Sequence, residues 1–284
     1  MKFILGNLIV IASVVGGYLM AHGKLAILWQ PAELVIIGGA AFGAFVITNS
    51  TKVLKAATAG VPGLLAGSPY NRSAYMELLS LMYELFTKAR KEGLMALEAH
   101  VEEPANSDVF NKFPKILKDH AALDFITDYL RMIVGGNMNA MELENLMDAE
   151  LDNHHHTAAL PGSAIVTMGD ALPGFGIVAA VLGVIITMGS IGGSPAELGL
   201  HIAAALVGTF LGILLAYGFV GPMGNAMKEI AEEEGKYLMC IKMCILATLN
   251  GYSPQVAVEF GRKVIDHSER PNFIELEEYI KQPR

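Results

Sequence analysis

Four stretches of the chain are almost free of charged residues and are long enough to cross a lipid bilayer as helices. A helix needs about 20 apolar residues to span the hydrocarbon core. The predicted spans cover residues 3–21, 33–50, 171–192 and 198–222. Hydrophobic residues make up 53% of the sequence and charged residues only 17%, a balance that disfavours a water-soluble globular protein. We therefore expect an all-α integral membrane protein with four transmembrane helices.

The four spans form two hairpins. The short connection Gly193–Glu197 forces the third and fourth spans to be antiparallel neighbours. Pro31 and Glu33 suit the start of the second span, because proline fits a first helical turn and an acid complements the helix dipole. The predicted parts are a transmembrane hairpin at 1–50, a cytoplasmic helical domain at 51–168, a second hairpin at 169–225 and a cytoplasmic helical tail at 226–284.

The placement of basic residues predicts the orientation. Of the 20 lysines and arginines, 18 lie in residues 50–168 and 223–284, whereas the short loops between paired spans hold only Lys24. Cytoplasmic segments carry the excess of positive charge in membrane proteins. We therefore expect both termini and the long middle segment in the cytoplasm, and the loops near 22–30 and 193–199 on the outer side. The first apolar run lacks a convincing cleavage site and is expected to be a retained span rather than a signal peptide.

The long middle segment shows the spacing of amphipathic helices. Apolar residues recur every three or four positions, for example at Leu78, Met82 and Leu85, and no strand-like alternation interrupts them. Helix breaks are expected at Gly60–Pro69, Pro104, Gly135–Gly136 and Pro161–Gly162. This segment therefore predicts a compact helical domain, completed by a tail helix near residues 226–249.

Several functional classes are disfavoured. A net charge of −8 gives no basic surface for nucleic acid, and no motif of a hydrolase, zinc enzyme or nucleotide-binding site appears. Three consecutive histidines, His154–His156, point in three directions on a helix, so we expect them to be solvated rather than metal ligands. Cys240 and Cys244 are expected to be reduced packing residues. We predict neither an enzyme nor a bound cofactor or metal.

The last two spans contain no obvious ion ligand. No residue from Ala171 to Gly193 is ionisable, and from Leu198 to Met227 the only histidine or charged residue is His201. An ion path normally needs a titratable group within the membrane, so any carboxylate for such a path is expected from a partner. Small residues instead recur at helical spacing, which indicates either ordinary helix packing or a seat for another helix. They are Gly176, Ala179, Ala180, Gly183, Thr187, Ala205, Gly208, Thr209, Gly212 and Ala216.

Two prolines lie at the expected cytoplasmic ends of these spans. Pro173 follows Asp170-Ala171-Leu172, and Pro222 follows Gly221. Proline removes a backbone donor and ends or kinks a helix. From spacing alone, each proline either terminates a span or forms a hinge.

Three runs of sequence resemble the MotA family of flagellar stator subunits, which is related to the ExbB and TolQ channels. They are 172–184 (LPGFGIVAAVLGV), 208–222 (GTFLGILLAYGFVGP) and 30–39 (QPAELVIIGG), and the resemblance extends over the whole chain. It implies a subunit of the bacterial inner membrane that forms a pentameric ring around MotB. MotB supplies the mid-membrane aspartate and anchors to peptidoglycan, and the complex drives the rotor protein FliG.

The resemblance also implies roles for individual residues. Pro173 and Pro222 match the prolines that couple ion passage to movement, and Arg90 and Glu98 match residues that contact FliG. Glu150 falls where relatives carry an acid, without a defined role. The residues expected to line the ion channel are Ala179, Ala180, Gly183, Thr209 and Gly212.

Protons are the expected coupling ion. Sodium-driven members of the family tend to carry Gly-Thr in place of Ala179-Ala180 and paired threonines in place of Gly208-Thr209. Hydroxyl groups replace part of a sodium hydration shell, whereas methyl groups cannot. The alternatives are a sodium-driven stator, an ExbB-like or TolQ-like energiser, a secondary transporter and a structural scaffold. The first hairpin counts against the energiser, and the lack of polar groups at the midplane counts against the transporter.

Overall fold

The protein was examined as a computed structural model that describes residues 2–136, 139–189, 192 and 194–282. Within these residues the chain is helical and contains no strand, which confirms the predicted all-α class. Four apolar helical stretches are long enough to cross a membrane, as the sequence predicted. They cover Lys2–Met20, Leu25–Thr48, Ala140–Gly189 and Pro195–Leu249.

The chain divides into two compact units. One unit holds Met1–Gly67 and Ala158–Glu229 and is called the membrane unit below. The other holds Ser68–Thr157 and Ile230–Arg284, carries most of the charged side chains, and is called the charged unit. The long helices α9 and α11 contribute residues to both units.

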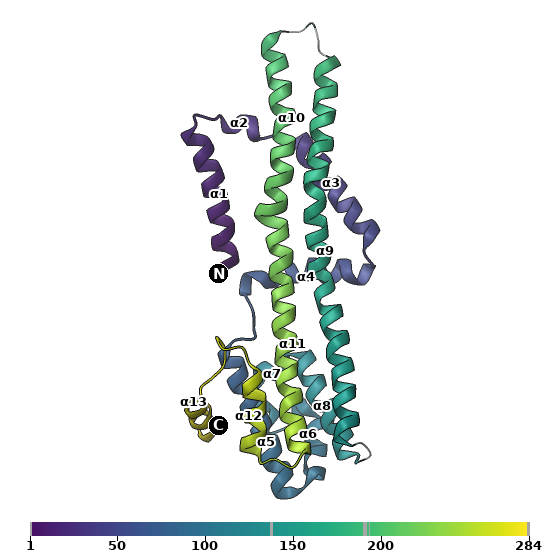
Figure 1. The fold of residues 1–284 in the computed structure, drawn as a ribbon, viewed down its shortest axis with the longest axis vertical. Coiled ribbons are helices and arrows are strands. Elements are labelled where there is room, and N and C mark those ends of the chain that lie inside the picture. Colours follow the sequence, from purple (N-terminus) through teal and green to yellow (C-terminus); the bar gives the residue numbers. More distant parts are fainter. Residues whose placement is uncertain (1, 137–138, 190–191, 193, 283–284) are drawn as a thin grey trace. The chain divides into compact units, whose positions relative to one another are not determined.

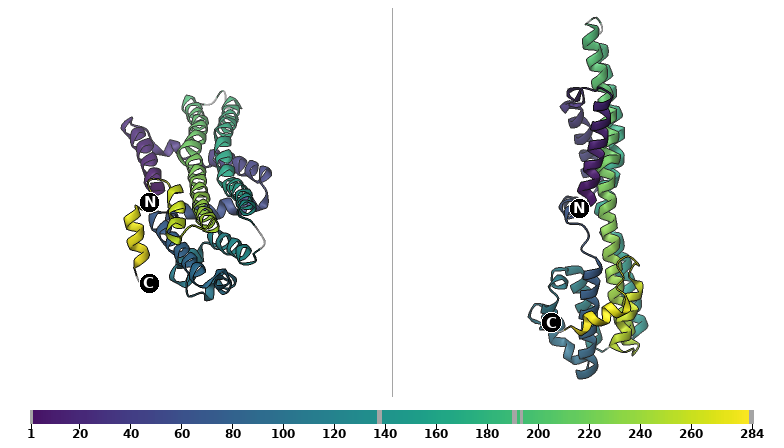
Figure 2. Two further views of the ribbon diagram at one scale, coloured as in Figure 1. Left: turned by 60° about the horizontal axis from the view of Figure 1, so that its bottom comes forward. Right: turned by 90° about the vertical axis from the view of Figure 1, so that its left-hand side faces the viewer.

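In the membrane unit, α9 and α10 form a hairpin, whereas α1 and α3 lie apart from each other on the α10 side and the α9 side of it and are joined through α2 (Figure 1). The left view of Figure 2 shows α9 running beside α10, and the two helices overlap in the right view. The unit comprises α1 (Lys2–Met20), α2 (Leu25–Leu28), α3 (Pro31–Thr48), α4 (Thr51–Ala66), the later part of α9 (Ala140–Gly189), α10 (Pro195–Leu215), the π-helical turn η4 (Ala216–Val220) and the start of α11 (Gly221–Leu249).

Local sequence explains where these helices begin. Pro31 is the first residue of α3, and Pro195 is the first residue of α10. Ser194 and Glu197 form a reciprocal capping box at the start of α10, which satisfies two backbone donors that a helix start leaves unpaired. The fourth span therefore has a well-defined beginning.

Helix α4 packs with the spans. It crosses behind α9 and α11 rather than running alongside them (Figure 1). Ala57 of α4 is buried in a cluster with Phe45, Ala164 and Ile165. The expected division at residue 50 thus cuts through a packed unit, although the limits of the lipid layer itself stay a prediction.

The predicted break at Pro161–Gly162 is wrong, whereas the break predicted within Gly60–Pro69 is confirmed in its later part, because α4 ends at Ala66. Helix α4 continues through Gly60 and ends only at Ala66, and α9 continues through Pro161 and Gly162. A Cβ on Gly60 would lie 2.6 Å from the Met227 side chain, and a Cβ on Gly162 would lie 2.8 Å from the carbonyl oxygen of Gly224. Close packing onto α11 therefore stabilises both segments as helix despite their low helix propensity. The breaks at Pro104 and Gly135 are confirmed, because η2 begins at Pro104 and α8 ends at Val134.

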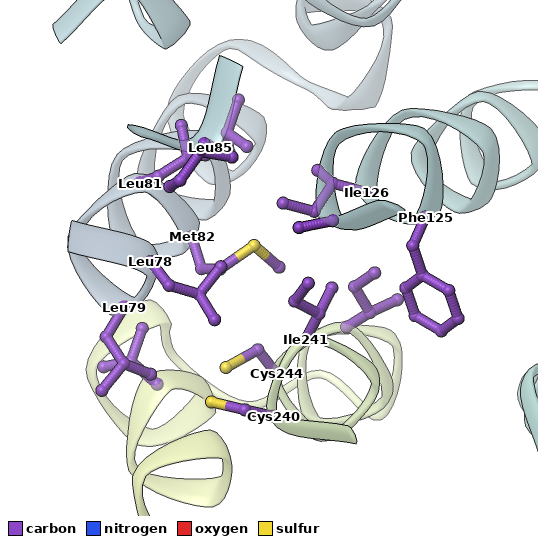
Figure 3. Packing of buried hydrophobic residues seen from close by; sticks show 14 of the residues in the cluster. Leu78, Leu79, Leu81, Met82, Leu85, Phe125, Ile126, Cys240, Ile241 and Cys244 are labelled. Atoms are coloured by element: carbon purple, nitrogen blue, oxygen red, sulfur yellow. The ribbon is translucent and has the colours of Figure 1, made fainter. Parts of the chain in front are cut away.

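The charged unit is a helical domain with its own hydrophobic core. Figure 3 shows Ile241, Cys240 and Cys244 of α11 facing α5 and α8 in this core. Both cysteines are buried and free, in agreement with their expected packing role. Besides parts of α9 and α11, the unit comprises α5 (Arg72–Glu92), η1 (Leu94–Leu97), α6 (Glu98–Glu102), η2 (Pro104–Asn106), η3 (Phe110–Lys112), α7 (Pro114–Lys118), α8 (His120–Val134), α12 (Pro254–Val264) and α13 (Phe273–Lys281).

Candidate functional site

Glycines at every seventh position of α9 form a seam with the neighbouring helices. They are Gly162, Gly169, Gly176 and Gly183, and each faces α10 or α11. A seven-residue period keeps one helix face against its partner over several turns. Gly176 and Gly183 belong to the small-residue pattern predicted from the sequence, whereas Gly162 and Gly169 lie before the predicted span 171–192.

The seam brings the helix backbones into contact. A Cβ on Gly176 would lie 2.9 Å from the carbonyl oxygen of Gly208, and one on Gly212 would lie 2.8 Å from the carbonyl oxygen of Leu172. A Cβ on Gly183 would lie 2.8 Å from that of Ala205. These glycines therefore pack within the chain, which is the simpler of the two interpretations of the small-residue pattern.

The remaining channel-lining candidates differ in exposure. Ala179 is completely buried and packs with Ile37 and Ala41 of α3. Ala180 and Thr209 are half-buried. Their channel-lining roles, and those of Gly183 and Gly212, stay predictions.

An apolar stripe on α9 remains uncovered by the chain itself. Ile177, Val181, Val184 and Met188 are between 51% and 59% exposed and recur at helical spacing on one face. Ala180 lies beside this stripe, one turn from Ile177 and from Val184. The stripe offers an uncharged surface to lipid or to another helix.

The two prolines lie within continuous helix rather than ending it. Pro173 is inside α9, and Pro222 is the second residue of α11, directly after the π-helical turn. A helical proline leaves the carbonyl four residues earlier without its usual donor. These carbonyls belong to Gly169 and Gly218.

The backbone hydrogen bonds that the two prolines remove belong to neighbouring parts of the same seam. A Cβ on Gly169 would lie 3.2 Å from the backbone nitrogen of Gly221, the residue before Pro222. The helix backbones therefore approach each other closely where both hydrogen-bond ladders are interrupted. The π-helical turn accommodates the missing donor, as such turns often do at functional positions.

Glu33 is a candidate that sequence analysis missed. Its side chain is buried, and Oε2 has no hydrogen-bond partner among the described residues. A Cβ on Gly208 would lie 2.6 Å from this oxygen. Gly208 falls near the middle of the predicted span 198–222, so this carboxyl group contacts the fourth span although that span carries no carboxylate of its own there. The sequence alone does not show that the start of α3 packs beside Gly208 of α10.

The two expected rotor-binding residues lie on the surface of the charged unit. Arg90 is in the last turn of α5, and Glu98 is the first residue of α6. Gly93, whose φ is +90°, turns the chain between them. Both side chains are exposed, and neither forms an ion pair within the described chain. Both are thus available to a partner.

Glu150 and His154 both have partners inside the charged unit. The Tyr129 hydroxyl donates a 2.5 Å hydrogen bond to Glu150 Oε2, and burial together with this carboxyl raises the pKa of Tyr129. His154 Nε2 lies 3.6 Å from Glu234 Oε1, and this carboxyl raises the pKa of His154. Among the described residues no group of three potential metal ligands occurs.

Comparison with known proteins identifies the family. The chain is 50% identical to "Motility protein A" of Salmonella typhimurium over 284 residues, which cover 100% of this chain and 96% of that protein. The chain belongs to the motility protein A family. It is also 49% identical to "Motility protein A" of Escherichia coli over 281 residues, with 99% and 95% of the two chains covered.

Family profiles and solved structures agree with this membership. Residues 4–93 match the family described as "Motility protein A N-terminal", and residues 118–239 match the "MotA/TolQ/ExbB proton channel family". The fold is similar to a structure of C. jejuni MotAB, with a TM-score of 0.79, 21% identity and coverage of 95% and 98%. It is also similar to the flagellar MotAB stator complex from Bacillus subtilis, with a TM-score of 0.69, 26% identity and coverage of 90% and 92%. The predicted stator subunit is confirmed at the level of the family.

Proposed function

We propose that this chain is the ring-forming subunit of a proton-driven flagellar stator, in which α9, α10 and α11 convert proton passage into movement of the charged unit. The observation that carries the proposal is the seam around Gly169 and Gly221. Two prolines interrupt hydrogen bonding there, while the helices remain continuous on both sides. This combination suits a hinge, because a small change in backbone geometry can be transmitted along rigid helices.

The partner is a MotB-type protein whose membrane helix contributes an aspartate. Two of the similar solved structures are MotAB complexes. The uncharged stripe around Ile177 and Val181 offers a surface for an apolar helix, with Ala180 beside it. Glu33 is largely buried within this chain, with 7% of its surface exposed, and does not replace the partner's acid. By family resemblance, five copies of this chain surround two MotB chains.

The charged unit contacts the rotor protein FliG through Arg90 and Glu98. Exposed ion pairs contribute only about 0 to 1 kcal/mol each. A weak contact of this kind suits a motor that makes and breaks it in every step. The unpaired state of both side chains within the described chain supports this role.

The positions of Lys2 and of the other basic residues support an orientation with both termini in the cytoplasm and the subunit in the bacterial inner membrane. Protons are the coupling ion, since Ala179, Ala180 and Gly208 offer no side-chain oxygen to sodium. The proposed cycle contains no covalent step. An ExbB-like or TolQ-like energiser is disfavoured because the match to motility proteins includes the first hairpin.

Rescue of rotation tests the proposal. The chain and its MotB partner are induced together in a flagellated strain without stators, and tethered cells are observed in sodium-free buffer. Stepwise recovery of rotation is expected as individual stators assemble. Recovery only after sodium addition would overturn the proton assignment. Paralysis in both buffers, with both proteins inserted in the membrane, would overturn the stator function itself.

A further inference from the structure

The carboxyl group of Glu33 is buried against Gly208, one of the small residues of the seam. Glu33 lies in the first turn of α3 and is only 7% exposed. Its Oε2 fits over Gly208, where any larger residue would displace it, because an added Cβ would lie 2.6 Å away. The same Cβ would lie 3.2 Å from that of Ala179. Glycine at 208 and alanine at 179 therefore leave a notch that the carboxyl group occupies.

The notch lies well inside the predicted membrane region. Gly208 is 13 residues after Pro195 at the start of α10, which corresponds to about 20 Å of helix. Figure 1 shows the paired ends of α9 and α10 extending beyond α2, the short helix that precedes α3. Glu33 thus reaches the seam from the side, and its carboxyl group is buried against Gly208.

The nearby charges do not neutralise this carboxyl group. The elements packed against it carry few titratable groups: Glu197 and His201 on α10, Lys24 before α2, and none on α9 from Ala171 to Gly189. None of them forms a hydrogen bond or ion pair with Glu33 among the described residues. A buried carboxylate without a donor is costly, whereas a carboxyl group that holds a proton is much less so.

His201 lies on the same face of α10 as Gly208. The two residues are seven positions apart, which is two helical turns or about 10 Å. The Nδ1 atom of His201 is also buried without a hydrogen-bond partner in the described chain. Two unpaired titratable groups therefore follow one another along a seam that is otherwise apolar.

We propose that Glu33 is a proton-binding residue of the ion path, which takes up a proton from the side of His201 and releases it toward the partner's acid. The step is the reversible protonation of a carboxylate, so the proton that enters also leaves. This inference rests on the proposed stator function and adds to it a titratable group within this chain. Gly208 and Ala179 are then positioning residues, because they leave the space that the carboxyl group needs.

The direct test is Glu33→Gln, which keeps the size of the side chain but cannot titrate. Rotation is measured with small beads at low load, where ion transfer limits speed, and with large loads that report torque and stator assembly. We expect low-load speed to fall about ten-fold or more, as for the loss of a positioned proton-transfer group. At high load, the stepwise increases in rotation speed that mark the assembly of individual stators should persist. The matched control Glu197→Gln, at an exposed carboxyl group of α10, should rotate like the unmodified chain.

A second pair of variants separates proton binding from packing. Gly208→Ala should displace the carboxyl group and reduce low-load speed. Glu33→Ala combined with Gly208→Ala refills the notch without restoring an acid, so it should remain slow. Wild-type speed of the double variant, or of Glu33→Gln, would overturn the proposal. The unmodified chain rotates in the same assay if the stator function is correct, so its paralysis would instead overturn that function.

Discussion

At the scale of single residues, the absence of a side chain determines much of the membrane unit. Gly176 and Gly212 lie where the carbonyl oxygens of Gly208 and Leu172 occupy the space of a Cβ. Glycine normally weakens a helix by about 1 kcal/mol relative to alanine. Here the close approach of two backbones outweighs that cost, because lipid-embedded helices gain stability mainly from packing.

Gly212→Ala should destabilise the complex by about 1 to 3 kcal/mol, the usual cost of overpacking a rigid interior. Its methyl group would lie 2.8 Å from the Leu172 carbonyl oxygen and 3.0 Å from the Gly176 Cα, and backbone atoms cannot move aside as a side chain can. Thermal unfolding of the purified complex measures the effect. Gly174→Ala is the matched control in the same hairpin, since its Cβ would meet no atom within 4 Å. Equal melting temperatures for both variants would contradict the packing account.

Arg90→Glu should reduce swimming and torque while membrane insertion and MotB binding remain intact. The side chain is exposed at the end of α5 and has no partner in the described chain that the substitution would release. Lys118→Glu, which reverses another exposed charge of the same unit, is the control and should swim normally. Loss of MotB binding in Arg90→Glu would indicate a structural role instead.

At the scale of elements, the sequence predicted the positions of most helices better than their ends. Apolar runs predicted α1 and α3, which are apolar along their length, and regular spacing predicted α5 and α8, which each bury one face in the core of the charged unit. The continuity of α9 through Pro161 and Pro173 could not be predicted from the sequence, because a proline within a helical pattern normally predicts a break or a kink. The helix persists through contacts with α10 and α11, which are distant in sequence. Glu33 was missed for the same reason, since its neighbour Gly208 is known only from the fold.

Pro173→Ala should separate stability from function in α9. Alanine restores a backbone donor for the Gly169 carbonyl, and an interior proline costs a helix about 3 kcal/mol. The variant complex should therefore be at least as stable as the original, yet it should produce little or no torque because the hinge is stiffer. Thermal unfolding and tethered-cell rotation measure the two properties. Normal torque in this variant would remove the hinge from the mechanism.

The contact between α9 and α11 in the charged unit should depend on pH. Because Glu234 raises the pKa of His154, the folded protein binds this proton more tightly than the unfolded chain. The stabilisation is fully present below about pH 6.5, the ordinary histidine value, and is lost as pH rises through the higher folded value.

His154→Ala should therefore lower the melting temperature more at pH 5.5 than at pH 8.5. The two losses in the free energy of unfolding should differ by at most about 1 kcal/mol. His155 is exposed on the next position of the same helix, and His155→Ala is the control. Equal losses at both pH values for His154→Ala would show that its contribution is packing rather than charge.

At the scale of the whole molecule, the sequence separates membrane spans from a charged helical domain, and the structure shows two compact units that share α9 and α11. The family and its stator role could be predicted from runs such as 172–184. The proposed contacts with MotB, FliG and further copies involve neighbours that a single chain does not contain.

Native mass spectrometry of the purified complex tests the proposed assembly. The family resemblance implies five copies of this chain with two MotB chains, and the uncharged stripe that is exposed on α9 in the single chain offers a surface for other helices in such an assembly. A stable complex with another ratio would contradict the proposed ring.

The most direct test of the central claim is rotation speed in sodium-free buffer while the proton-motive force is lowered in steps. If this chain couples proton passage to torque, the speed of tethered cells falls in proportion to the proton-motive force and does not respond to added sodium. Rotation that ignores the proton-motive force, or that follows the sodium gradient, would contradict the account.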